Sequence, residues 1–346
     1  MKRIFLILCF FSISTLFLNA QKGGDFIPTE EYGFHEGLSP FNDASSGLWG
    51  YMDKTGKTII PAKYYEISPF SEGLSIVATG CGYMLEKNGE MVMDEKIYFV
   101  INKTGKTVFN FEKLSLYYFD FTFHEGLANV TMRDSDYNEY QTFIDTTGKI
   151  VSFPGFNVIG NFSNGLALFQ TQDETGNLKY GYINRAGKIA IPAIYDQARS
   201  FSEGAAFTTI SDVSGSKSFF IDVSGKKLFD TQPFDVSDFR DGLALIWADE
   251  SPKRFKYLDK TGKETLVITK EYYSINEFFD GLAKVSIWAD DGLLYGYVDK
   301  SGREAIPPQY KDAGNFSEGL APVFIDGKIG FIDKTGKFAI KPKFEP

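Results

Sequence analysis

The sequence has few residues of the kinds that form metal centres and nucleophilic active sites. Its 346 residues include only two cysteines and two histidines. Cys9 lies in an N-terminal segment that we expect to be removed, so Cys81 is the single thiol of the mature chain. A single thiol excludes an internal disulfide, and no basic residue close to Cys81 in the sequence would lower its pKa. We therefore expect Cys81 to be inert and the stability of the chain to come from packing.

The two histidines do not favour metal binding or triad chemistry. His35 and His124 occupy the same slot in two copies of one short motif, FHEGL. A zinc site needs three or four clustered ligands, and a hydrolytic triad needs a histidine beside a serine or cysteine nucleophile. The sequence therefore predicts no metal, no cofactor and no enzymatic activity. Both histidines are expected to be exposed substitutes for serine.

Long hydrophobic runs are lacking after the first twenty residues. Lys2 and Arg3 precede an apolar run over residues 4–18, and a small residue ends it at Ala20. This layout is typical of a secretory signal peptide, here residues 1–20, and the run is shorter than the approximately twenty residues of a membrane span. We expect an exported protein with no transmembrane span in the mature chain. Its location would be the periplasm, the outer surface or the medium.

Positive charge is scarce in the remaining chain. Without residues 1–20 the sequence has 34 basic and 45 acidic residues, a net charge of −11. An acidic surface repels phosphate backbones, and no run of Lys and Arg forms a basic stripe. The charge balance therefore disfavours nucleic-acid binding.

The sequence does contain a strong internal repeat. One motif is Phe-x-x-Gly-Leu, with Ala in place of Leu in one copy. The other motif is a hydrophobic pair followed by Asp or Asn, two variable residues, Gly and a base. The two alternate strictly, eight times each. Self-similarity at a period of roughly 40 residues indicates a solenoid, a propeller or a related array. The repeats start near residues 34, 70, 123, 162, 201, 239, 278 and 316.

The pattern within each repeat predicts β-strands. After Gly-Leu, small or β-branched residues alternate with variable ones, as in Ala128 and Val130, which is the period of a half-buried strand. The Asp-x-x-Gly segment is typical of a hairpin turn, because Asp accepts backbone N–H bonds and Gly supplies a positive φ. A third strand follows and ends at Ile-Pro in the better copies, and helical periodicity is absent.

We therefore predict an all-β fold, a tandem array of eight three-stranded antiparallel β-meander repeats over residues 34–346. Residues 21–33, which include FIPTEEY, are expected to form an N-terminal cap or half-repeat. Propeller blades usually have four strands, so the short repeats favour an open twisted solenoid, with propeller-like closure as the alternative.

The stretch GLWGYMDKTGKTIIPAKY resembles the WG repeat, a bacterial module found in tandem and named for a Trp-Gly pair, here Trp49-Gly50. The resemblance covers about residues 34–346, although repeats 2, 3, 5 and 6 lack the pair. It implies a β-rich array with a binding or scaffolding role, and it brings no catalytic residues. The pair is degenerate elsewhere, at Tyr180-Gly181, Tyr295-Gly296 and Ile329-Gly330.

The loop that follows the Gly-Leu strand varies most among the repeats, and repeat 2 inserts a hairpin there. Trp247 and Trp288 lie near these loops in adjacent repeats. They are either contact anchors for a protein or a sugar, or side chains that fill gaps at the rim of a sheet. The sequence therefore predicts a non-enzymatic scaffold that binds a protein or glycan of the cell envelope.

Three other interpretations have weaker support. The acids of the Asp-x-x-Gly turns suggest a cation-binding ring, but each is explained by its own turn. Residues 134–145, DSDYNEYQTFID, resemble a calcium loop without the required glycine, so a polar hairpin loop is favoured. A carboxylate-dependent enzyme acting on polysaccharides stays an alternative, because paired carboxylates come together only in three dimensions.

Overall fold

The computed structural model describes most of the repeat array. The predicted signal peptide, Cys81 and most of the predicted cap lie outside the described residues. No helix in the described part is long and apolar enough to cross a membrane. The described residues are 32–80, 84–87, 90–93, 96–111, 116–119, 122–133, 139–231, 236–247, 255–290 and 292–344.

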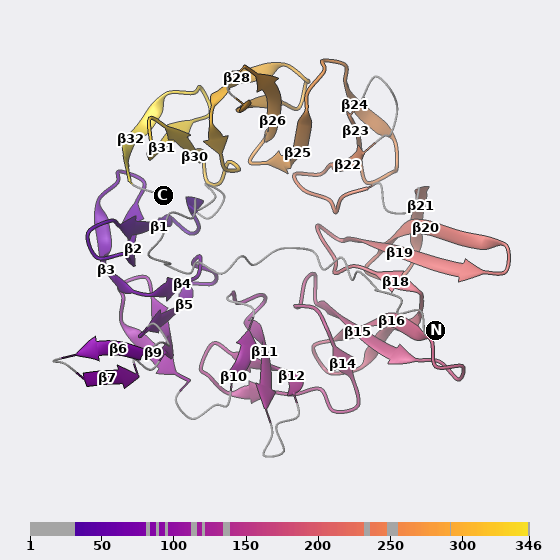
Figure 1. Cartoon of the computed structure of the whole chain (residues 1–346). Coiled ribbons are helices and arrows are strands. Elements are labelled where there is room, and N and C mark those ends of the chain that lie inside the picture. Colours follow the sequence, from indigo (N-terminus) through magenta and orange to yellow (C-terminus); the bar gives the residue numbers. More distant parts are fainter. Residues whose placement is uncertain are drawn as a thin grey trace, which may run out of the picture.

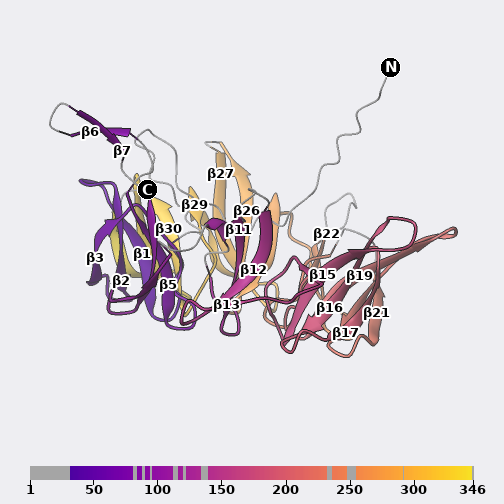
Figure 2. The same ribbon diagram turned by 90° about the horizontal axis from the view of Figure 1, so that it is seen from below.

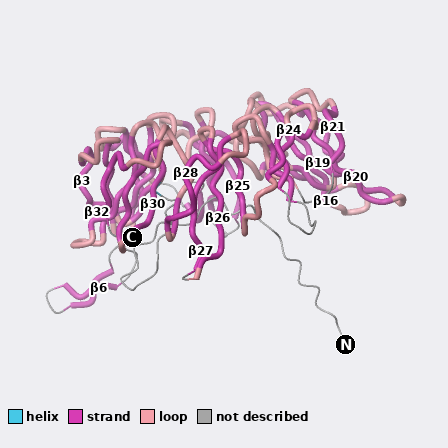
Figure 3. Tube along the Cα trace, turned by 90° about the horizontal axis from the view of Figure 1, so that it is seen from above, coloured by secondary structure: helices cyan, strands magenta, loops and turns pink. Residues whose placement is uncertain are grey.

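The fold is all-β, as predicted, and consists of eight small antiparallel sheets arranged in a ring (Figure 1). Seen edge-on, the sheets stand side by side like the blades of a propeller (Figures 2 and 3). Each sheet contains one copy of the repeat, so we number the blades 1 to 8 in chain order. Within each blade the strands follow one another in sequence from the axis outwards.

The first four blades contain the following strands. Blade 1 has β1 (Leu38–Asp43), β2 (Leu48–Asp53) and β3 (Thr58–Tyr64). Blade 2 has β4 (Glu66–Ile67), β5 (Leu74–Thr79), β8 (Ile97–Asn102) and β9 (Thr107–Asn110), with an inserted hairpin of β6 (Met84–Lys87) and β7 (Glu90–Met93). Blade 3 has β10 (Leu116–Phe119), β11 (Leu127–Arg133), β12 (Glu139–Asp145) and β13 (Ile150–Val151). Blade 4 has β14 (Asn157–Val158), β15 (Leu166–Gln172), β16 (Leu178–Asn184) and β17 (Ile189–Tyr195).

The second half of the ring repeats this order. Blade 5 has β18 (Gln197–Ala198), β19 (Ala205–Asp212), β20 (Gly215–Asp222) and β21 (Lys227–Thr231). Blade 6 has β22 (Ala244–Trp247), β23 (Phe255–Leu258) and β24 (Glu264–Ile268). Blade 7 has β25 (Ser274–Phe279), β26 (Leu282–Ala289), β27 (Gly292–Asp299) and β28 (Glu304–Tyr310). Blade 8 has β29 (Asp312–Ala313), β30 (Leu320–Ile325), β31 (Lys328–Asp333) and β32 (Phe338–Phe344).

Most blades have an innermost strand in addition to the three that were predicted. Among the described residues, six blades have four strands, whereas blades 1 and 6 have three. The additional strand is often only two residues long, as in β4 and β18, and pairs with the strand that follows Phe-x-x-Gly. So short a segment has no visible alternation of apolar residues, which is why the repeat pattern does not reveal it.

The two kinds of turn lie on the same face of the ring, because antiparallel strands reverse direction at each connection. The Phe-x-x-Gly turn joins the first strand of a blade to the second, and the Asp-x-x-Gly turn joins the third to the fourth. We call this face the turn face. The connections between the second and third strands lie on the opposite face, which we call the variable-loop face. The inserted hairpin β6–β7 projects from it (Figure 3).

The glycine of the Trp-Gly pair is required by a bulge in the outermost strand. In blade 4, Tyr182 pairs with Ile191 and Tyr180 with Tyr195, so Gly181 faces three residues of β17 that begin with Pro192. A Cβ on Gly181 would lie 2.7 Å from the Ile191 oxygen, which no side chain tolerates. The same register shift occurs at Gly50, Gly296 and Gly330.

Blades 2, 5 and 6, which lack the glycine, have no such bulge at this position. In blade 5, Phe219 stands where Gly181 stands in blade 4 and pairs directly with Asp230. Blade 6 shows the same regular pairing at Lys256, which faces Val267. The Trp-Gly pair and the Ile-Pro element are therefore two parts of one structural feature. A prolyl bulge on the outer strand also protects an exposed edge from pairing with another chain.

An aromatic contact between neighbouring blades recurs in the core. The residue after the glycine of one blade packs on the Phe of the next Phe-x-x-Gly turn, as in Tyr182 and Phe201, whose ring centroids are 4.8 Å apart. The Tyr182 hydroxyl also donates a hydrogen bond to the Arg199 carbonyl at 2.7 Å. Equivalent ring pairs are Tyr51–Phe70, Phe143–Phe162, Phe220–Phe239, Tyr257–Phe278, Tyr297–Phe316 and Phe331–Phe34.

The array closes into a ring, so the preferred prediction of an open twisted solenoid is not the form adopted; the propeller-like alternative is. Blade 8 packs on blade 1 through the same contact that joins consecutive blades, Phe331 against Phe34 at 5.2 Å (Figure 1). Phe41 and Phe344 extend this interface, with ring centroids 6.0 Å apart. Because the last repeat offers the first one a standard interface, closure buries apolar surface that an open array leaves exposed.

Candidate functional site

The variable-loop face carries an exposed pair of aromatic side chains in blade 7. Trp288, near the end of β26, is 63% exposed, and Tyr273, just before β25, is 50% exposed. Their ring centroids are 5.5 Å apart and their planes are inclined at 77°, an edge-to-face arrangement. Trp288 therefore does not fill a gap in the sheet rim. The pair presents apolar surface to solvent in a fixed geometry.

Trp247, the other predicted contact residue, ends β22 in blade 6. Its backbone pairs with Phe255 of β23, so it lies at the corresponding end of the neighbouring blade. Its side chain is outside the described part of the structure, as is the loop over residues 248–254. The prediction that Trp247 contributes to binding therefore stays a prediction.

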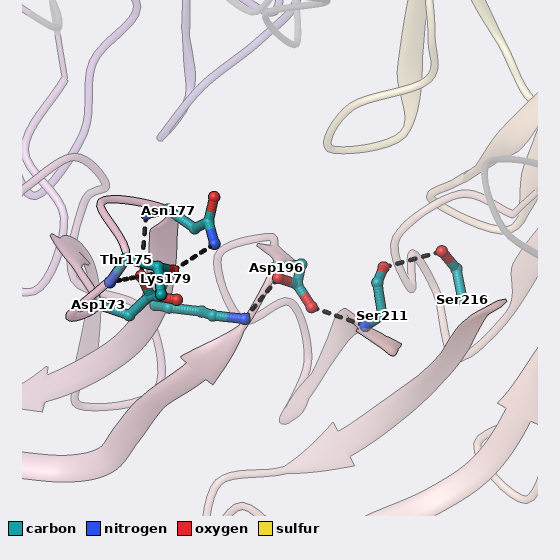
Figure 4. Close-up of polar contacts among 7 residues, drawn as sticks. All are labelled: Asp173, Thr175, Asn177, Lys179, Asp196, Ser211 and Ser216. Atoms are coloured by element: carbon teal, nitrogen blue, oxygen red, sulfur yellow. Dashed lines mark hydrogen bonds and ion pairs between the residues drawn. The ribbon is translucent and has the colours of Figure 1, made fainter. Parts of the chain in front are cut away.

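Blades 4 and 5 carry a polar network on the same face (Figure 4). Lys179 of β16 donates to Asp196 at 2.6 Å, and Asp196 in turn accepts the Ser211 backbone N–H at 2.6 Å. Ser211 also bonds to Ser216 through their hydroxyl groups at 2.8 Å. The β15–β16 loop is held separately by Asp173, which accepts the Thr175 hydroxyl at 2.7 Å. This network joins two blades and keeps the loops of different length in place.

The turn face carries a feature that the sequence did not suggest, a ring of contacts between neighbouring Phe-x-x-Gly turns. The Glu36 carboxylate of blade 1 accepts the backbone N–H of Gly73 of blade 2 at 2.8 Å. Glu318 of blade 8 accepts the N–H of Gly37 of blade 1 at 2.9 Å and so completes the circle. We call this contact the clasp. Its other acceptors are Glu72, Glu125, Asn164, Glu203, Asp241 and Asp280.

Each clasp acceptor has a left-handed backbone, with φ between 50° and 55°. Asn and Asp are the usual non-glycine residues in that conformation, because it costs other side chains roughly 1 kcal/mol. Here Glu occupies it five times, in FHEGL, FSEGL and FSEGA. The recurrence of Glu before Gly was the available signal, since a turn alone does not favour Glu whereas a side chain that reaches the next blade does.

A base from the Asp-x-x-Gly turn reinforces most of the clasps. Lys103 of blade 2 lies 3.0 Å from the Glu36 carboxylate, and Lys54 of blade 1 lies 3.0 Å from Glu318. In blade 5 the base is replaced by Val223, and the facing acceptor is the uncharged Asn164. Acid and base are thus lost together at that interface. Further bases in this role are Lys260, Lys300 and Lys334.

Acid should weaken the clasps. Desolvation alone would raise the pKa of Glu36, but hydrogen bonds from Lys103 and Gly73 lower it below the usual value of 4.5. The pKa of Glu318 is lowered in the same way by Lys54 and Gly37. The folded chain therefore binds these protons less readily than the unfolded chain. Their stabilisation is complete above about pH 4.5 and is lost as the pH falls through the lower folded values.

We expect the Tm to fall steadily between about pH 5 and about pH 3, measured by circular dichroism. The control is the double variant Glu36→Gln, Glu318→Gln, which keeps an amide oxygen for each glycine N–H but cannot titrate. Its Tm should be lower at neutral pH and should fall less on acidification. An equally steep fall in the double variant would show that the Glu36 and Glu318 clasps do not contribute to the acid sensitivity.

The acids of the Asp-x-x-Gly turns have the turn role that was predicted. Asp53 accepts the Thr55 N–H at 2.9 Å, the Thr55 hydroxyl at 2.6 Å and the Lys57 N–H at 3.1 Å. The Thr55 hydroxyl is the main reason why the pKa of Asp53 is lowered. Asn102 makes the same bonds without a charge. These side chains are therefore occupied within their own turns.

The described residues include no cluster of three or more His, Cys, Asp or Glu side chains that could hold a metal ion. His35 and His124 are both exposed, as predicted, in the turns of blades 1 and 3. His124 bonds only locally, to the Thr122 hydroxyl at 2.8 Å. Of the predicted calcium-like loop, residues 134–138 lie outside the described part, and Asp145 serves its own turn by accepting the Thr147 N–H at 2.9 Å.

The sequence model of one protein family, the WG containing repeat, matches five stretches of the chain. They include all four blades in which the glycine faces the prolyl bulge. No curated protein sequence shows significant similarity to the chain. The matched residues are 49–80, 142–174, 180–211, 295–328 and 329–345.

Solved structures with similar folds are distant in sequence. A eukaryotic initiation factor has a TM-score of 0.49 and 11% identity, with 91% of each chain covered. Dipeptidyl peptidase 4 of Porphyromonas gingivalis has a TM-score of 0.49 and 10% identity, covering 93% of this chain and 59% of its own. A puromycin hydrolase has a TM-score of 0.43 and 9% identity, covering 80% of this chain and 53% of its own. The chain thus spans little more than half of the last two proteins, and these similarities carry no inference about activity.

Proposed function

This chain is a WG-repeat protein, and we propose that it is an exported, non-enzymatic scaffold that binds a protein or glycan of the cell envelope through its variable-loop face. The observation that carries the proposal is the exposed pair of Trp288 and Tyr273 on that face. Large aromatic side chains that a monomer leaves in solvent are typical contact residues for proteins and for sugar rings.

The arrangement of the ring supports this role. Neighbouring blades are joined by clasps and, at seven of the eight interfaces, by the buried aromatic pairs, so the second and third strands of each blade have fixed positions. The connections between these strands differ in length from blade to blade, from the two residues Asp326 and Gly327 in blade 8 to the inserted β6–β7 hairpin in blade 2. A rigid ring with varied loops on one face can present different contacts without altering its core.

An enzymatic role has less support. A glycosidase needs two carboxylates across a cleft, and the one that acts as general acid has a raised pKa. The clasp carboxylates lie on one face of the ring, but each accepts a glycine N–H, and the pKa of Glu318 is lowered. Their geometry explains structural use, so we propose a binding protein and not a carboxylate-dependent enzyme.

Trp288→Ala should reduce capture of the partner at least about tenfold, because the exposed indole supplies apolar contact area worth roughly 2 kcal/mol. The measurement is affinity capture from cell-envelope extracts with the mature chain as bait. Phe338→Ala is the control, since it removes an aromatic that is 40% exposed on the outermost strand of blade 8. Equal capture by Trp288→Ala and the wild type would contradict the proposed binding face.

The same capture distinguishes the two kinds of partner. An extract digested with protease loses a protein partner, whereas an extract oxidised with periodate loses a glycan partner. Bait and Trp288→Ala are compared in both extracts, so that only Trp288-dependent capture is counted. Fractionation of cells that produce the full chain tests the proposed export, which predicts the mature chain outside the cytoplasm.

A further inference from the structure

A hollow of ≈ 390 Å³ lies on the turn face near the axis, where it is lined by the Phe-x-x-Gly turns of blades 5, 6, 7 and 8. It is on the opposite side of the ring from Trp288, so the inference drawn from it is independent of the proposed function. Volumes from about 300 Å³ upwards are typical of small-molecule sites. The hollow is lined by Glu203, Arg240, Asp241, Phe278, Phe279, Asp280, Phe316, Ser317 and Glu318.

Two residues that line the hollow break the repeat. The second position of the Phe-x-x-Gly turn is Ser or His in six blades, but it is Arg240 in blade 6 and Phe279 in blade 7. Where it is Ser, its hydroxyl can donate to the Phe carbonyl of the next blade, as Ser202 does to Phe239 at 2.7 Å and Ser317 to Phe34. Neither Arg240 nor Phe279 has a hydroxyl for this structural bond. The two exceptions are in adjacent blades and face one hollow.

Among the charged residues around the hollow, Arg240 is the one without an ion pair to a described residue. Its four carboxylates belong to clasps, and each has a lysine within 4.0 Å. Arg240 forms no ion pair with any described residue, and its guanidinium lies 5.8 Å from the centre of the Phe279 ring. A guanidinium in this situation keeps its five N–H donors for solvent or for an anion. The paired residues are Glu203–Lys260, Asp241–Lys300, Asp280–Lys334 and Glu318–Lys54.

We propose that this hollow binds a carboxylate that carries an apolar group and a neighbouring amide, the chemistry of the C-terminal residue of a peptide. The Arg240 fork binds both oxygens of the carboxylate, which is the geometry that a guanidinium favours over a lysine ammonium. The Phe279 ring packs against the apolar side chain of the ligand. The amide N–H of the ligand donates to the Phe316 carbonyl. The equivalent carbonyl in blade 6, that of Phe239, accepts a hydrogen bond from Ser202 of blade 5, but blade 7 has Phe279 in place of that serine.

The test uses the full-length chain and two probes of nearly equal shape, N-acetylphenylalanine and N-acetylphenylalaninamide. Isothermal titration calorimetry should show binding of the acid and at least about tenfold weaker binding of the amide, because only the acid pairs with Arg240. This comparison needs no variant, so it does not depend on how any substitution folds. Higher salt should weaken binding of the acid and leave the amide unaffected.

Arg240→Ser places in blade 6 the residue that four other blades have at this position, so the turn should fold, and the unfolding temperature verifies it. Binding of the acid should weaken at least about tenfold. Lys217→Ser is the control, because Lys217 lies in β20 at the variable-loop end and its loss changes the net charge equally. The proposal is overturned if acid and amide bind equally, if Arg240→Ser binds like the wild type, or if the acid does not bind at about 10 mM.

Discussion

Replacing Phe331 by alanine lowers the free energy of unfolding by about 4 kcal/mol, because the ring closes on this side chain. Phe331 in β31 of blade 8 is fully buried and packs on Phe34 of blade 1, with ring centroids 5.2 Å apart. Its loss leaves a cavity between the first and last repeats. Denaturant unfolding of the full-length chain, followed by tryptophan fluorescence, measures the change.

The matched control is Phe220→Ala. Phe220 occupies the same position in blade 5, is also fully buried and packs on Phe239 of blade 6 at 5.0 Å. A closed ring predicts similar losses for the two variants, since both remove one side chain from one blade interface. An open array predicts that Phe331 is exposed and that its replacement changes the free energy of unfolding little. A loss below about 1 kcal/mol for Phe331→Ala, beside several kcal/mol for Phe220→Ala, would contradict closure.

The repeating elements of the fold were predictable because each depends on contacts that are local in the sequence. The Asp53 turn is an example, since its hydrogen bonds reach only Thr55 and Lys57. The alternation of Ala128 and Val130 likewise reports a strand with one buried side, and both residues are fully buried. Such patterns depend on neighbours two to four residues away, so they identify the strands and turns of one blade.

Closure of the ring was not predictable from the same patterns. Gly37 and Glu318 are 281 residues apart in the sequence, and their bond exists only because the rotation from blade to blade sums to a full turn. Nothing in a single repeat specifies that rotation. The sequence length of the repeat favoured three strands and an open array, whereas short inner strands such as β18 complete four-stranded blades.

The candidate sites were predictable only in part. Trp288 stood out as an aromatic beside a variable loop, and its side chain is exposed, while its contact role stays a prediction. Arg240 did not stand out, because a single Arg in a variable slot of a repeat has no meaning until its neighbours are known. Its significance comes from the adjacent Phe279 and from the lysines that pair with the surrounding carboxylates.

Gly181→Ala should lower the free energy of unfolding by about 3 kcal/mol, although it adds only one methyl group. The added Cβ would lie 2.7 Å from both the Ile191 oxygen and the Ala193 nitrogen. These are backbone atoms of β17, so relief requires the third and fourth strands of blade 4 to separate and their hydrogen bonds to weaken. Differential scanning calorimetry of the full-length chain measures the change.

Gly176→Ala is the control for the general effect of replacing a glycine. Gly176 lies in the β15–β16 loop with φ +83°, and a Cβ there meets nothing within 4 Å. Alanine at that position has only the left-handed backbone cost of roughly 1 kcal/mol. Equal losses in the two variants would show that the bulge yields easily and that the glycine is not needed for it. A loss about 2 kcal/mol larger at Gly181 would establish that Trp-Gly and Ile-Pro are present together because one accommodates the other.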